Sequence, residues 1–96
     1  MMNVNGVGSE QITVDDTTGG VSMTVPTAAK KAVITVRTAP IRYLDDSTAP
    51  TATLGHVLEP GDRLTYMDAN YQSALNKFRA IRTGSTSGVI DVSYYD

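Results

Sequence analysis

The sequence predicts a small all-β domain: a β-sandwich or barrel of about seven short strands, with at most one short helix near residues 68–75. Two observations favour this fold class. Short segments of alternating apolar and polar residues recur at roughly ten-residue spacing, and Gly, Pro, Asp and Ser lie between them. The strand–helix–strand alternation of nucleotide-binding α/β folds is absent from the sequence.

The expected strands end at turn residues. Segment 21–25 has its apolar residues on one face and stops at Pro26, which cannot donate to a ladder. Segment 32–38 has the strongest alternation and points Ile34 and Val36 to the same side. Further strands are expected at 41–44, 54–58, 63–67, 76–82 and 89–95.

Two connections have clear turn chemistry. Residues 59–62 read Glu-Pro-Gly-Asp and predict a type II turn, because Pro presets φ at its second position and Gly61 accepts a positive φ at its third. Residues 45–50 predict a loop, because Asp side chains accept hydrogen bonds from the backbone just after them. The helix expected at 68–75 is one or two turns long.

The first 20 residues contain few large apolar side chains, and only 12–14 could form a short strand. We therefore divide the chain into an N-terminal arm, 1–20, and a β-sandwich domain, 21–96. The arm is either a frayed terminus or a segment that becomes ordered on a partner. In the second case Ile12 and Val14 are its candidate contact residues.

Composition and charge limit the partners and sites that we expect for this chain. The 96 residues carry a net charge of −2, and their basic residues are scattered, so we expect no nucleic-acid partner. The absence of cysteine excludes disulfides and thiolate metal sites. No signal-peptide pattern and no membrane-spanning apolar run is seen, so we expect a soluble chain made in the cytoplasm that binds no membrane.

The sequence offers no catalytic constellation. His56 is the only histidine and has no second His or Cys to share a zinc ion. The adjacent carboxylates at 15–16 and 45–46 lack the spacing of a calcium loop, and the second pair is expected to consist of turn residues. We therefore expect neither an enzyme nor a cofactor.

Tyrosines are the remaining candidate contact residues, since their apolar body and polar tip favour interfaces. Tyr94 and Tyr95 are neighbours on one expected strand, so their side chains point to opposite faces and one of them should lie outside the core. Tyr71 lies in the expected helix. These three tyrosines could serve either a protein interface or a carbohydrate platform.

The second two thirds of the chain also contain short pieces with a familiar pattern. They lie at 33–43, 46–51, 55–58, 61–64, 78–82 and 92–95. Together they resemble small virion structural proteins of tailed bacteriophages, of the kind often encoded beside the major capsid protein.

The central piece is also similar to the immunoglobulin-like domain at the C-terminus of chitobiase-type enzymes. The matching positions are Tyr43, Asp45, Ser47, Pro50, Thr51 and the Arg79-Ala80 pair. Asp46 departs from that family, which has Gly there. Both resemblances imply a β-sandwich, immunoglobulin-like in the second case, and neither implies an active site.

The leading hypothesis is a phage capsid decoration, or cement, protein located in the virion, with the major capsid protein or another virion protein as its partner. A homo-oligomer is expected, and a trimer would match the symmetry of capsid junctions. The alternatives are a head–tail connector, tail or fibre component and, from another class, a carbohydrate-binding module.

Overall fold

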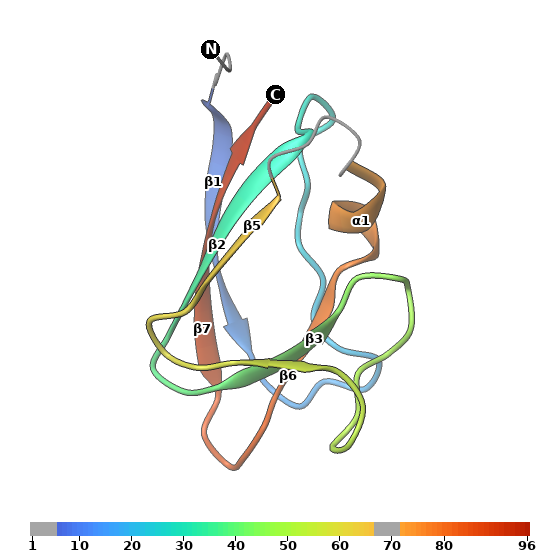
Figure 1. Ribbon diagram of the computed structural model, residues 1–96, viewed down its shortest axis with the longest axis vertical. Helices are drawn as coiled ribbons and strands as arrows, with labels where there is room; N and C mark the ends of the chain where they lie inside the picture. The colour runs from blue at the N-terminus through green and yellow to red at the C-terminus, as the bar shows by residue number, and fades with distance from the viewer. Residues whose placement is uncertain (1–5, 67–71) are drawn as a thin grey trace.

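Two antiparallel β-sheets lie face to face and enclose the core (Figure 1). The computed structural model describes residues 6–66 and 72–96. Its elements are β1 (Gly6–Val14), β2 (Lys31–Arg37), β3 (Ile41–Leu44), β4 (His56–Leu58), β5 (Arg63–Tyr66), α1 (Gln72–Lys77), β6 (Arg79–Arg82) and β7 (Gly88–Tyr95). This arrangement confirms the predicted small all-β sandwich.

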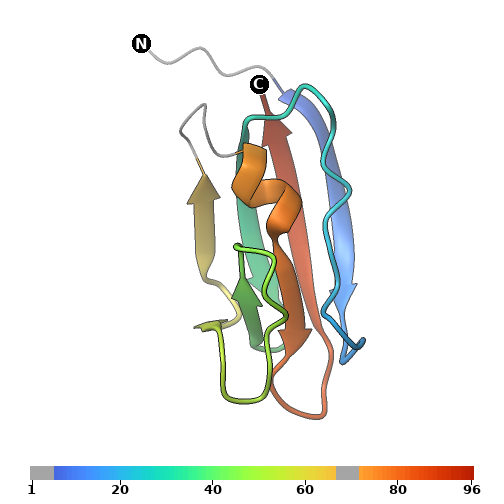
Figure 2. The same ribbon diagram turned by 90° about the vertical axis from the view of Figure 1, so that its right-hand side faces the viewer.

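The larger sheet has the order β1-β7-β2-β5, and the smaller has the order β4-β3-β6. The last strand, β7, therefore lies between β1 and β2, and the edges of the larger sheet are β1 and β5 (Figure 2). In constant immunoglobulin domains the last strand instead belongs to the same sheet as the sixth. The sandwich described here thus has a different strand order.

The core forms where the inward faces of the two sheets meet. β2 and β7 alternate strictly between buried residues and half-buried or exposed ones, as the sequence predicts. The largest fully buried side chains are Tyr94, Phe78, Ile34, Ile41, Leu75, Ile90, Val14, Val36 and Val92.

The N-terminal region differs from the predicted arm. Residues 6–14 form β1, which pairs with β7 of the same chain from Gly6↔Tyr95 to Val14↔Gly88. A register shift between Gly6 and Gly8 interrupts the alternation, which hides the strand pattern in the sequence. The boundary at residue 20 therefore does not separate β1 from the sandwich.

Segment 21–25 is not the predicted strand. It makes one isolated bridge, Val21↔Ala80, to the edge of β6. Its alternation still holds, because Met23 is buried and Val21 and Val25 pack against the core. The segment therefore lines the core between the two sheets and does not extend either of them.

Helix α1 ends two residues later than predicted, at Lys77 instead of residue 75, and shortens the strand after it. Residues 68–71 of the predicted helix lie outside the described residues, and the described helix continues to Lys77. Leu75 and Phe78 are both buried, and the Phe78 N–H donates to the Leu75 carbonyl at 3.3 Å. Burial at a spacing of three residues favours a helical turn over a strand, so β6 begins at Arg79.

The predicted 59–62 turn is present. The Asp62 N–H donates to the Glu59 carbonyl at 2.9 Å, and Gly61 has a φ of +94°. In the 45–50 loop the Thr48 N–H donates to Asp46 Oδ1 at 3.0 Å, which matches the predicted role of Asp side chains there.

Candidate surfaces for binding

The predicted contact residues lie mostly inside the sandwich. Val14 and Tyr94 have exposed fractions of 0% and 1%, and Ile12 is partly buried against the core. Tyr95 faces the other way and is half-buried, as expected for one member of the pair. Tyr71 lies outside the described residues. Of these five residues, the structure therefore leaves only Tyr95 on an outward face among those it describes.

Tyr94 is buried, so it is not available to the tyrosine platform considered for carbohydrate binding. Tyr94 donates its hydroxyl hydrogen to Glu10 Oε2, and the same oxygen accepts the Thr24 N–H at 2.9 Å. Burial, together with this hydrogen bond, raises the pKa of Tyr94 far above its ordinary value. Glu10 therefore joins β1, β7 and segment 21–25, a role that the sequence did not indicate.

The outward face of the larger sheet is the broadest regular surface of the described chain. We call it the outer sheet face. It consists of Ser9, Gln11 and Thr13 of β1; Val89, Asp91, Ser93 and Tyr95 of β7; Lys31, Val33, Thr35 and Arg37 of β2; and Arg63 and Thr65 of β5. Most of these side chains are uncharged and polar, and the charged ones are three cations, Lys31, Arg37 and Arg63, and one carboxylate, Asp91.

A polar network crosses the middle of the outer sheet face. Asp91 accepts hydrogen bonds from Gln11 Nε2 and from Arg37 Nη2, both at 3.1 Å, and its second oxygen lies 2.9 Å from Arg37 Nε. The Gln11 hydrogen bond is the largest cause that lowers the pKa of Asp91, and Arg37 lowers it further. The network connects three adjacent strands and neutralises the one carboxylate on this face.

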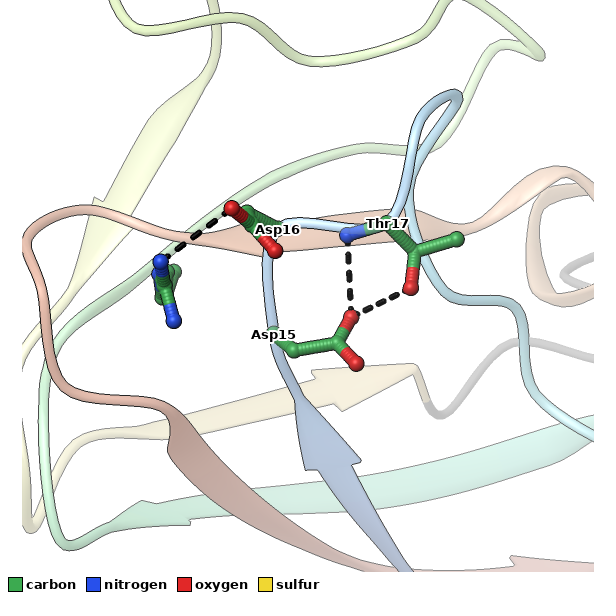
Figure 3. Close-up of polar contacts among 4 residues, drawn as sticks. Asp15, Asp16 and Thr17 are labelled. Carbon is green, nitrogen blue, oxygen red and sulfur yellow. Dashed lines mark hydrogen bonds and ion pairs between the residues drawn. The ribbon is translucent and has the colours of Figure 1, made fainter.

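The paired acids at 15–16 have structural partners. Asp15 Oδ1 accepts hydrogen bonds from both the backbone N–H and the hydroxyl of Thr17, while Asp16 pairs with Arg82 at 3.1 Å (Figure 3). The Thr17 side chain is the largest cause that lowers the pKa of Asp15. These acids close the turn after β1 and attach it to β6.

His56 and two apolar side chains mark the edge of the smaller sheet. The His56 ring lies 5.4 Å from the Tyr43 ring, which stacks in turn on the buried Phe78 at 5.4 Å. Leu54 and Val57 are 49% and 44% exposed. The contact with Tyr43 therefore accounts for the position of His56. Single exposed apolar residues such as Leu54 and Val57 are ordinary on a protein surface.

Residues 6–66 and 72–96 contain no detected pocket and no group of three or more His, Cys, Asp or Glu that could hold a metal ion. Within the same residues, no helix has the length and apolarity needed to cross a membrane.

The chain was compared with protein families, curated proteins and solved structures. No family model, no curated protein and no solved structure matches it.

Proposed function

We propose that this chain is a structural protein of a bacteriophage virion, namely a capsid decoration protein that binds the outside of the assembled head. The observation that carries the proposal is the resemblance of the second two thirds of the chain to small virion proteins. The resembling pieces overlap β2, β3, β4, β5, β6 and β7, so they belong to one folded unit.

The outer sheet face is the surface that we assign to the capsid. It offers a four-stranded area of mostly uncharged side chains, and it carries Tyr95, whose apolar body and polar hydroxyl favour an interface. A domain of this size makes a modest contact with each capsid subunit. Repetition of these contacts over a closed shell would supply the affinity that a single contact lacks.

The test compares binding to assembled shells with binding to isolated capsid protein. We expect strong binding to shells and weak binding to the free subunit; equal affinity for both would contradict the cement role. Tyr95→Ser should weaken shell binding by about tenfold or more. Leu54→Ser is the matched control, because Leu54 is exposed outside the larger sheet and its loss should leave binding unchanged.

Copy number distinguishes the decoration role from the connector, tail or fibre role. Quantitative mass spectrometry of purified virions should find many copies per particle for a decoration protein and only a few for a connector. A few copies per particle would replace the decoration proposal with the connector hypothesis.

A further inference from the structure

The direction of the backbone groups in the larger sheet can be followed from strand to strand. The Val36 N–H donates to the Asp62 carbonyl at 3.1 Å, on the side of β2 that faces β5. In an antiparallel ladder the N–H and C=O groups of alternate residues point to the same side. Even-numbered residues of β2 therefore face β5, and odd-numbered residues face β7.

The same alternation continues across β7 to β1. Thr35 of β2 pairs with Asp91, so the odd-numbered residues of β7 point their backbone groups toward β2 and the even-numbered ones toward β1. Ile90 pairs with Ile12, so the even-numbered residues of β1 bond to β7. The backbone N–H and C=O groups of odd-numbered residues in β1 therefore point away from the sheet.

A separate contact supports this direction. The Asp15 carbonyl, next in the odd-numbered series, accepts the Arg82 N–H at 2.9 Å from β6, outside the β1–β7 ladder. Before Asp15, the outward-pointing groups belong to Ser9, Gln11 and Thr13. Within the described part of the chain, no backbone hydrogen bond from another segment reaches these three residues on that side.

The outer edge of β1 lacks several devices that commonly protect a sheet edge. Natural edge strands are often short or carry Lys or Pro. β1 is nine residues long and contains neither. Two other devices are present: a register shift between Gly6 and Gly8 at the start of the strand, and the inward-turned Glu10, which accepts hydrogen bonds from Tyr94 and Thr24. The outward-pointing residues are uncharged, so another strand could approach without charge repulsion from β1.

We propose that this edge binds the same edge of a second copy of the chain. In an antiparallel pair with its two-fold axis at Gln11, Gln11 lies opposite Gln11 of the partner subunit, and Ser9 lies opposite Thr13 of the partner subunit. Every outward-pointing N–H in this stretch then meets a carbonyl, and no like charges lie directly opposite each other. The two larger sheets join into one continuous sheet.

A second copy fits this edge because the spacing is self-complementary. The outward-pointing positions Ser9, Gln11 and Thr13 are evenly spaced, so they coincide with one another when a second strand is reversed about Gln11. An isologous interface requires this symmetry. The pair closes on itself because each copy has one β1 edge. Because the contact is confined to one strand edge, we expect a weak dimer that depends on concentration. The proposal does not depend on the capsid role and predicts two copies in place of the trimer.

Sedimentation velocity of the full chain, from about 10 μM to about 1 mM, tests the proposal. We expect a monomer that converts to a dimer as concentration rises. Gln11→Pro should abolish the dimer, because it removes the central outward N–H, while an outward-facing position on an edge strand tolerates Pro. Thr65→Pro is the matched control: Thr65 is exposed, and by the same alternation its N–H points away from β2 on the opposite edge.

The variants distinguish β1 pairing from other modes of association. A dimer that persists in Thr65→Pro and disappears in Gln11→Pro supports β1 pairing. A wild-type monomer at the highest concentration, a trimer, or equal loss of the dimer in both variants would overturn it. If Gln11→Pro unfolds, Gln11→Cys provides a second test, since the chain has no other cysteine. A short bis-maleimide should then cross-link Gln11→Cys into dimers but not Thr65→Cys, and equal or absent cross-linking would contradict the proposal.

Discussion

Gly88, the first residue of β7, lies where the chain passes from the smaller sheet to the larger one, and it has no space for a side chain. A Cβ atom there would lie 2.6 Å from the Ala39 carbonyl oxygen and 2.6 Å from Ile41 Cγ2. Real Cβ atoms essentially never come within 3.0 Å of such neighbours. Gly88→Ala therefore requires the backbone at Ala39, the buried Ile41 or the start of β7 to move.

The expected cost follows from the nature of these contacts. Overpacking a close-packed core costs about 1–3 kcal/mol. One contact at Gly88 is with backbone and the other is with a fully buried β-branched side chain, so neither neighbour can rotate away. We expect the upper part of the range, a loss of about 2–3 kcal/mol. For a domain of this size that corresponds to a fall in Tm of about 10–20 °C.

Urea and thermal unfolding followed by far-ultraviolet circular dichroism measure this loss. Gly84→Ala is the matched control, because Gly84 lies in the loop just before β7 and a Cβ there meets nothing within 4 Å. We expect Gly84→Ala to change the free energy of unfolding by no more than about 0.5 kcal/mol. Costs for the two variants that agree within that margin would refute the close approach of Gly88 to Ala39 and Ile41.

Three further outcomes are expected from urea unfolding. Gly61→Ala should cost about 1–2 kcal/mol through its φ of +94° alone, since a Cβ there contacts nothing within 4 Å; no cost would refute the turn geometry. Tyr94→Phe should cost about 1–2 kcal/mol, because it removes the hydroxyl that donates to Glu10, and an unchanged midpoint would contradict that hydrogen bond. The folded-state pKa of Asp91 lies below its ordinary value of 3.8, so its stabilising contribution is present above that pH and disappears as the pH falls through the folded pKa. Asp91→Asn should therefore flatten the fall in stability between about pH 5 and about pH 2, and an unchanged slope would contradict the network around Asp91.

The sequence predicted only part of the candidate binding surface. Alternation correctly predicted that one member of the Tyr94–Tyr95 pair faces outward, but it could not say which. Val14 was expected to contact a partner as part of an arm, and it is instead fully buried in the chain's own core. The outward edge of β1 could not be predicted, because polar residues and a register shift hide the strand in the sequence.

The sequence by itself determined which residues face the core in its regular segments. In β2 and β7 the inward residues follow from a period of two, a local property of an extended backbone. The turn at 59–62 is equally local, because Pro and Gly limit their own dihedral angles. Even segment 21–25, which does not form a regular strand, keeps the predicted inward side.

Only the tertiary structure decided which strands are neighbours. Alternation gives a strand two faces and does not name the strand beside it, because pairing depends on hydrogen bonds between residues far apart in the chain. Pairing between distant residues places β7 between β1 and β2. It also forms the bridge from Val21 to Ala80. This arrangement leaves the outer edge of β1 open, because β7 occupies its inner edge and segment 21–25 lies against the core beside it.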